Sequence, residues 1–86
     1  MRIEKKIHPK FFQLIIDGVK SYDLRLADFD INVGDVLVLR EWNSDTKEYT
    51  GRVLEKSVTY ISKTKDSKIY SKEDVEKFGY QIISFK

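Results

Sequence analysis

The chain has 86 residues, with sixteen basic and fourteen acidic side chains, a net charge of +2 at pH 7 and no cysteine. This length suits one domain with a modest core, because a domain so small buries only about 60% of its unfolded surface. The absence of cysteine excludes disulfide bonds, thiolate metal sites and a cysteine nucleophile, and a single histidine argues against zinc. We therefore expect neither a metal nor an organic cofactor.

The hydropathy of the chain predicts a protein outside the membrane. No segment approaches the roughly 20 consecutive apolar residues that a membrane span needs. Residues 1–6 are not followed by the apolar core of a secretory signal, so a cytoplasmic location is expected. The weakly basic charge permits nucleic-acid binding without requiring it, because local clustering matters more than the total. The composition leaves the oligomeric state open.

The first part of the chain predicts a strand, a helix and a second strand. Residues 2–7 form the first strand, and Pro9 suits the first turn of a helix, where its missing N–H costs nothing. Residues 10–19 carry apolar side chains at helical spacings, which predicts a helix buried against a sheet. Gly18 stands where a helix ends in a left-handed residue. A second strand is expected over residues 21–27.

The middle of the chain predicts a hairpin of two long strands. Residues 36–42 form the first strand, and its apolar run at 36–39 predicts an internal strand covered on both faces. Polar residues 43–48 form the hairpin loop. The chain returns over residues 49–62, with Gly51 as a bulge or bend.

The last part predicts a loop, a short helix and a final strand. Residues 63–68 are expected to be a solvated loop, and Ser71 opens a helix that ends at Phe78. Residues 80–85 form the last strand. The order predicts a single α+β domain over residues 1–86. Small twisted sheets often close on themselves, because closure removes exposed edges, so we expect a small mixed β-barrel of about five strands with two short helices.

Three charged residues follow the first predicted helix at close spacing. Lys20 comes directly after the helix end, and Asp23 and Arg25 share one face of the next strand, since side chains alternate along a strand. In one interpretation they form a surface ion pair worth about 0–1 kcal/mol. In the other, the two cations hold a phosphate or a carbonyl oxygen, and the aspartate orients the arginine or accepts from a base.

Residues 18–25 resemble the signature of ASCH domains, Gly-x-Lys-x-x-Glu-x-Arg, with an aspartate at position 23. Further along, residues 33–42, 49–52 and 79–83 are similar to the later strands of a compact bacterial and phage ASCH-like group of uncharacterised function. The resemblance spans nearly the whole chain. ASCH domains belong to the PUA-like superfamily of small β-barrels.

This resemblance implies a cleft beside the first helix, lined by the motif, that binds RNA or a modified nucleotide. By motif position, the residues that bind the ligand are Lys20, Asp23 and Arg25. The aspartate keeps the charge of the usual glutamate and is shorter by one methylene, which leaves its contacts open. On this interpretation the partner is RNA or a nucleotide-like small molecule.

Two alternatives remain. One branch of the ASCH family is an amidohydrolase acting on acetylcytidine, which would make Lys20 the catalytic candidate. That branch pairs the lysine with a threonine three residues on, where this chain has Asp23, and with a distant glutamate, for which Glu41 or Glu55 is available. The second alternative is an accessory module for protein interactions.

Aromatic and basic residues near the hairpin form a further candidate surface. Arg40 and Trp42 share a strand parity, and Tyr49 and Arg52 lie across the loop. Such groups stack bases at about 1–3 kcal/mol per base, whereas the alternative is that the rings simply cover the end of the hairpin. Tyr80 offers another stacking face. Lys5, Lys6 and His8 are expected to be a solvated basic group. We expect that replacing Lys20 or Arg25 abolishes binding and leaves the melting temperature nearly unchanged.

Overall fold

The computed structural model describes residues 1–64 and 71–86, so residues 65–68 of the expected loop lie outside the described part. Five strands and two helices follow one another as expected. Their bounds are β1 (Arg2–Ile7), α1 (Pro9–Ile16), β2 (Tyr22–Leu26), β3 (Val36–Asn43), β4 (Glu48–Lys63), α2 (Lys72–Phe78) and β5 (Tyr80–Phe85). The α+β class is confirmed.

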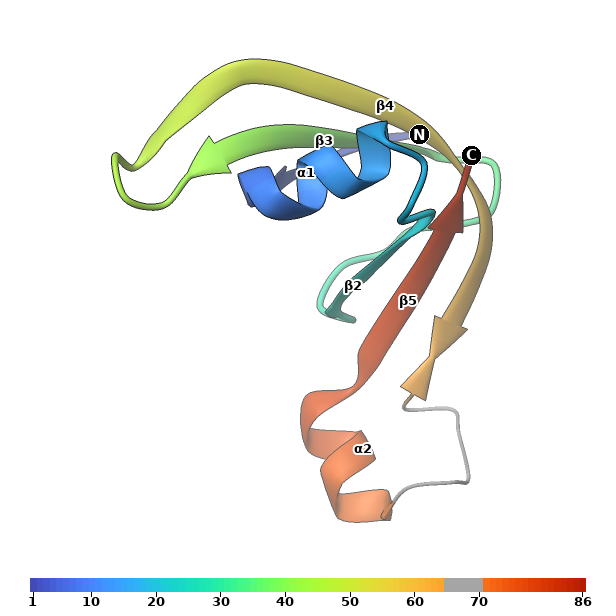
Figure 1. Cartoon of the computed structure of the whole chain (residues 1–86). Helices are drawn as coiled ribbons and strands as arrows, with labels where there is room; N and C mark the ends of the chain where they lie inside the picture. The colour runs from blue at the N-terminus through green and yellow to red at the C-terminus, as the bar shows by residue number, and fades with distance from the viewer. Residues whose placement is uncertain (65–70) are drawn as a thin grey trace.

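The strands form one five-stranded sheet in the order β1-β3-β4-β5-β2. β1 pairs with β3 in parallel, and the other three pairings are antiparallel. β1 and β2 are therefore the two edges of the sheet, and among the described residues no strand ladder joins them. The expectation of a closed barrel is wrong in this respect. α1 leaves β1 directly and lies inside the bend of the sheet (Figure 1). In place of a strand ladder, the guanidinium of Arg25 on β2 bonds to the carbonyl oxygen of Lys6 on β1.

The sheet bends along β4, which pairs with two different strands. Its first part pairs with β3 and its last part with β5, and Figure 1 shows the strand curving between them. Near the hairpin, the register jumps from the pair Arg40–Val53 to the pair Trp42–Tyr49. Gly51 lies in this irregularity with a φ of 96°, a conformation that side chains disfavour. The expected bulge at Gly51 is confirmed.

The core lies between α1 and the inner face of the sheet. Phe12 and Ile15 of α1 are buried in one cluster with Leu37 and Leu39 of β3. Val38, which points to the opposite face of β3, is only 2% exposed. This strand is therefore internal and covered on both faces, as its apolar run predicts.

Local sequence signals set the ends of α1. Pro9 occupies the first turn, and Gly18 adopts a φ of 75° after the last turn. The N–H of Val19 donates to the carbonyl of Leu14 at 3.0 Å, and the N–H of Gly18 donates to that of Ile15 at 3.1 Å. This pair of bonds is a Schellman motif, which ends the helix three residues earlier than the apolar pattern predicts. Lys20 follows directly after this motif.

The second helix, α2, begins where the sequence predicts. The hydroxyl of Ser71 accepts a hydrogen bond from the N–H of Asp74 at 3.3 Å, which caps the first turn. Gly79 follows the last helical residue and leads straight into β5. Neither this helix nor any other in the described part of the chain is long and apolar enough to cross a membrane.

Candidate functional site

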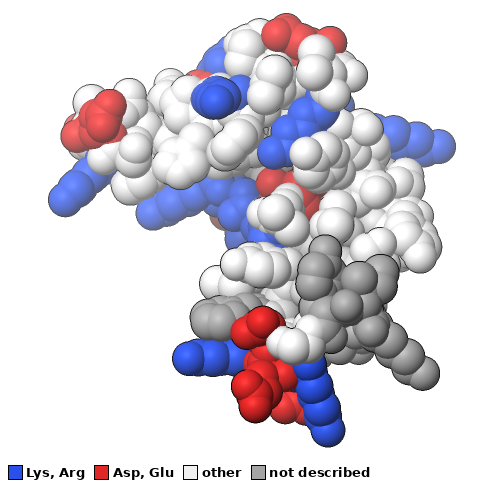
Figure 2. Space-filling view, turned by 60° about the horizontal axis from the view of Figure 1, so that its bottom comes forward, with Lys and Arg blue, Asp and Glu red and all other residues white. Residues whose placement is uncertain are grey.

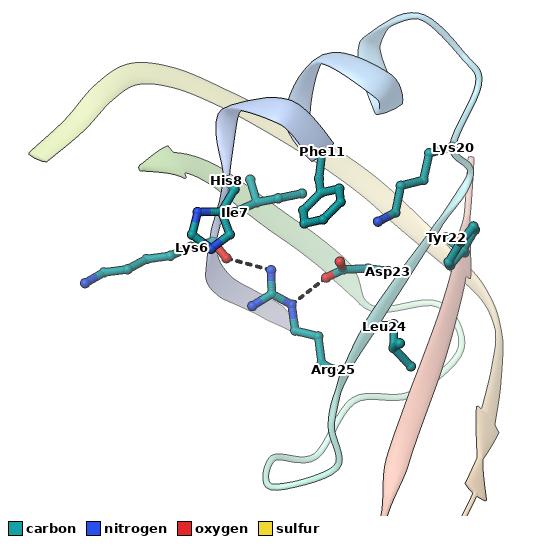
Figure 3. Close-up of a pocket in the computed structure, with 9 residues that line it drawn as sticks. All are labelled: Lys6, Ile7, His8, Phe11, Lys20, Tyr22, Asp23, Leu24 and Arg25. Atoms are coloured by element: carbon teal, nitrogen blue, oxygen red, sulfur yellow. Dashed lines mark hydrogen bonds and ion pairs between the residues drawn. The ribbon is translucent and has the colours of Figure 1, made fainter. Parts of the chain in front are cut away.

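A cavity of about 480 Å³ opens where the two edge strands approach each other. We call it the seam cleft. Its lining comes from the end of β1, from the start of α1, from the segment before β2 and from β2 itself: Lys6, Ile7, His8, Phe11, Lys20, Tyr22, Asp23, Leu24 and Arg25 (Figure 3). The structure thus brings Lys20, Asp23 and Arg25 together beside the first helix.

Arg25 joins the two sides of the seam cleft. Its Nε donates to Oδ2 of Asp23 at 2.5 Å, and its Nη2 donates to the carbonyl oxygen of Lys6 at 2.6 Å (Figure 3). Its side chain is 20% exposed, and that of Asp23 is 6% exposed. The carboxylate of Asp23 therefore orients the guanidinium, as one sequence-based interpretation proposes. Two of the donor groups of Arg25 are already used inside the protein.

Lys20 makes different contacts. Its Nζ lies 4.1 Å from the ring centroid of Phe11 and 5.0 Å from that of Tyr22. Figure 3 shows the side chain pointing between these rings toward the cleft. Cation–π contacts stabilise an ammonium without neutralising it. Within the described part of the chain Lys20 has no carboxylate partner, so its charge is available to a ligand.

The alternation of β2 is as expected, but its charged face is the inner one. Asp23 is 4% exposed, whereas Leu24 on the opposite face is 54% exposed. Asp23 and Arg25 lie opposite Ile83 and Gln81 of β5, both fully buried. The polar face turns inward because its charges are satisfied there by each other and by the carbonyl oxygen of Lys6.

A second cavity of about 410 Å³, here called the outer cavity, adjoins the seam cleft. Lys6 and Arg25 line both cavities. The further walls of the outer cavity are Glu4, Lys5, Arg40 and Tyr49. The guanidinium carbon of Arg40 lies 4.0 Å from the ring centroid of Tyr49, so the predicted pairing of a cation and a ring at the hairpin is present.

Trp42 and Tyr80 lie outside the lining of both cavities. Trp42 pairs across the hairpin with Tyr49, and Nζ of Lys6 lies 4.4 Å from its ring centroid. It therefore borders the outer cavity through Lys6. Tyr80 is at the start of β5, next to α2, and its backbone N–H donates to the hydroxyl of Thr64 at 2.6 Å. The structure thus does not bring Tyr80 together with the other candidates.

The buried carboxylate of Glu41 forms an ion pair with the half-exposed Arg52, which the sequence does not reveal. Nε and Nη2 of Arg52 donate to its two carboxylate oxygens at 3.0 and 2.7 Å, and the hydroxyl of Thr50 donates to one of them at 2.5 Å. The hydrogen bonds from Arg52 hold the pKa of Glu41 below its usual value. Arg52 also lies over the ring of Phe12 at 4.6 Å and reaches Gln13. This network fastens α1 to the distal part of the hairpin.

Sequence reasoning missed six of the nine residues that line the seam cleft, among them Lys6, Phe11 and Tyr22. Lys6 is exposed, as expected, but it also lines both cavities, and its carbonyl oxygen accepts a hydrogen bond from Arg25. Phe11 was expected to be buried, yet it is 38% exposed and forms the wall under Lys20. No signal in the sequence brings β1 next to β2, because the two strands are opposite edges of one sheet.

Comparison with known proteins places the chain in a family. Residues 4–82 match the family model described as "Domain of unknown function (DUF3850)". The chain belongs to this DUF3850 family. It is also 35% identical over 63 residues to the "Uncharacterized 12.9 kDa protein in GpA 3'region" of Escherichia phage P2. That alignment covers 73% of this chain and 56% of the phage protein, so the chain spans little more than half of its relative.

The DUF3850 match includes every element that builds the seam cleft. Residues 4–82 contain most of β1, all of α1 and β2, and the complete β3–β4 hairpin. The candidate residues of both cavities therefore lie within the part of the chain that defines the DUF3850 family.

Proposed function

We propose that this DUF3850 domain binds a nucleotide-like ligand, as a free molecule or as part of an RNA, in the seam cleft. The observation that carries the proposal is the setting of Lys20, an ammonium held over two rings with no carboxylate partner in the described chain. A phosphate needs a free cation, and a base needs an apolar or aromatic wall. The cavity of about 480 Å³ is of the size that small ligands occupy.

The resemblance to ASCH domains supports the same proposal. The motif positions 20, 23 and 25 all line the seam cleft. In this proposal Lys20 contacts the phosphate, and the rings of Phe11 and Tyr22 contact the base or sugar. Arg25 holds the shape of the cleft and contributes positive charge through its remaining donors.

The pairing of the candidate carboxylates with cations favours binding over hydrolysis. An amidohydrolase built on Lys20 needs a free carboxylate near the reacting carbonyl. Asp23 is engaged by Arg25, Glu41 by Arg52 and Thr50, and Glu55 by Arg2. Neither Glu41 nor Glu55 lines the seam cleft. We therefore propose binding without turnover.

The proposal is tested by titrating the protein with the four nucleoside monophosphates while recording amide shifts by NMR. We expect shifts at residues 6–8 and 20–25. Lys20→Ala is expected to weaken binding by at least about tenfold, the loss of one charge-assisted hydrogen bond. The matched control is Lys72→Ala in α2, at the far end of the molecule (Figure 1).

Two results would contradict the proposal. One is the absence of binding for all four monophosphates and for a mixed-sequence RNA. The other is equal weakening by Lys20→Ala and by the control. Incubation with acetylcytidine, followed by chromatography, separates binding from hydrolysis, because only an enzyme yields cytidine and acetate.

A further inference from the structure

The two cavities together form a longer surface than one nucleotide needs. The seam cleft and the outer cavity share Lys6 and Arg25 in their walls. Figure 2 shows Lys and Arg atoms gathered in a band beneath the hairpin, whereas the largest cluster of acidic atoms lies at the α2 end. The outer cavity is lined by four basic residues and one acidic residue, Glu4, so a ligand seated in the seam cleft can continue into a second, mainly basic cavity.

The two cavities meet at the β1 edge, where Lys6 and Arg25 line both. Ile7 belongs to the core cluster that contacts α1, so the neighbouring residue Lys6 points to the outer face. Lys6 pairs in register with Arg40 of β3, which places both cations on that outer face. Arg25 reaches the β1 edge from the inner face and bonds to the carbonyl oxygen of Lys6. The basic surface thus wraps around the edge of β1.

Three of the four cations that line the outer cavity have no carboxylate partner in the described chain and lie beside rings, whereas the fourth, Arg25, is paired with Asp23. Lys5, Lys6 and Arg40 have no carboxylate partner in the described chain. Arg40 stacks on Tyr49, whose side chain is 44% exposed. By contrast Arg2 and Arg52 are paired with glutamates elsewhere. Free cations beside exposed rings suit phosphates and unstacked bases, which a duplex does not offer.

Resting on the proposed function, we propose that the natural ligand is a single-stranded RNA of at least two to three nucleotides, one in the seam cleft and the next in the outer cavity. The strand passes around the β1 edge over Lys6 and Arg25. Lys6 and Arg40 contact its phosphates, and the second base stacks on Tyr49 or on the guanidinium of Arg40. Because the contacts reach phosphates and ring faces, sequence preference is weak.

The test is a length series of oligouridylate with one, two, three and five nucleotides, measured by calorimetry at several salt concentrations. Affinity is expected to rise steeply from one to three nucleotides and then level off.

Two variants test the outer cavity. Arg40→Gln and Tyr49→Ala are each expected to weaken binding of the trinucleotide by about five- to one-hundred-fold, which is the range for one stacked base. Each is expected to change the affinity for uridine monophosphate by no more than about twofold. Arg40→Gln also reduces the slope of log affinity against log salt by about 0.7. Circular dichroism checks that both variants fold, and Lys72→Ala is the charge-matched control.

The outcomes separate the two proposals. If uridine monophosphate binds as tightly as the trinucleotide, the seam cleft alone is the binding site. The proposal of a longer RNA-binding surface is then wrong, whereas the proposed function stands. If neither binds, both are wrong. The assignment of a single-stranded RNA is overturned if a duplex RNA binds as tightly as the trinucleotide. It is also overturned if a polyglutamate peptide binds as tightly as the trinucleotide and Tyr49→Ala does not weaken that binding.

Discussion

The guanidinium of Arg25 donates to the carbonyl oxygen of Lys6 at 2.6 Å and so links the two edge strands of the sheet. The same side chain is paired with Asp23, which is nearly buried. Arg25 therefore has a structural role in addition to any contact with a ligand. From the sequence alone, replacing either Arg25 or Lys20 is expected to leave the melting temperature nearly unchanged, and the structure separates the two residues.

Replacing Arg25 by alanine is expected to lower the free energy of unfolding by about 2 kcal/mol, because it removes two charge-assisted hydrogen bonds and leaves Asp23 buried without its partner. Urea denaturation followed by circular dichroism measures the change. Arg25→Lys keeps the charge but not both bonds, so its loss is expected to be intermediate. A variant Arg25→Ala as stable as the natural protein would show that the link across the seam contributes nothing.

Lys20→Ala is expected to leave stability almost unchanged, with a loss below about 1 kcal/mol, since its contacts with Phe11 and Tyr22 are cation–π contacts at a partly exposed site. Thermal unfolding measures this, and ligand affinity is measured on the same sample. A loss of several kcal/mol would mean that Lys20 is held for stability and not for a ligand.

Removing Arg52 is expected to destabilise the protein more than neutralising Glu41. Arg52→Ala leaves the buried carboxylate of Glu41 without its charged partner and is expected to cost about 2 kcal/mol, since Arg52 itself is half exposed to water. Glu41→Gln retains neutral hydrogen bonds and is expected to cost about 1 kcal/mol. Chemical denaturation of both variants gives the comparison. The reverse order would mean that the network matters for the packing of Arg52 on Phe12 more than for charge.

The same pair sets a pH dependence with a defined sign. Because the hydrogen bonds from Arg52 lower the pKa of Glu41 in the folded state, their stabilisation is fully present above the ordinary glutamate pKa of about 4.3. It is lost as the pH falls through the lowered folded value. The difference in unfolding free energy between the natural protein and Arg52→Ala should therefore shrink in acid. A difference that stays constant from neutral pH down to pH 2 would contradict this.

Gly18→Ala is expected to cost about 1 kcal/mol, since Gly18 has a φ of 75° and alanine disfavours this conformation, although open space surrounds the position. Gly18→Asn should cost less, because asparagine tolerates the left-handed region. Both are measured by thermal unfolding. If the two substitutions are equally costly, the effect does not arise from backbone conformation.

The elements of this fold are predictable because their signals are local. Pro9 and Ser71 open the helices, Gly18 ends the first one, and Gly51 lies at the bulge. Each of these residues acts on backbone groups only a few residues away, so its effect can be predicted from the neighbouring sequence alone.

The open sheet and half of the site are not predictable in this way. Whether β1 and β2 close a barrel depends on how far apart the bend of the sheet leaves its two edges, which no local signal determines. The place of Lys6 in the seam cleft follows from the same long-range arrangement. The pair of Glu41 and Arg52 depends on the register shift in the hairpin, which brings residues eleven positions apart to one point.

An open sheet carries a hazard that a barrel avoids, since unpaired strand edges are templates for pairing with another chain. In this protein the edge of β1 is occupied by Arg25, which caps a backbone carbonyl that a foreign strand would otherwise use. The long cations Lys5 and Lys6 stand on the same edge, where their charges repel a second copy. The residues proposed to attract a negatively charged ligand thus also discourage the protein from aggregating.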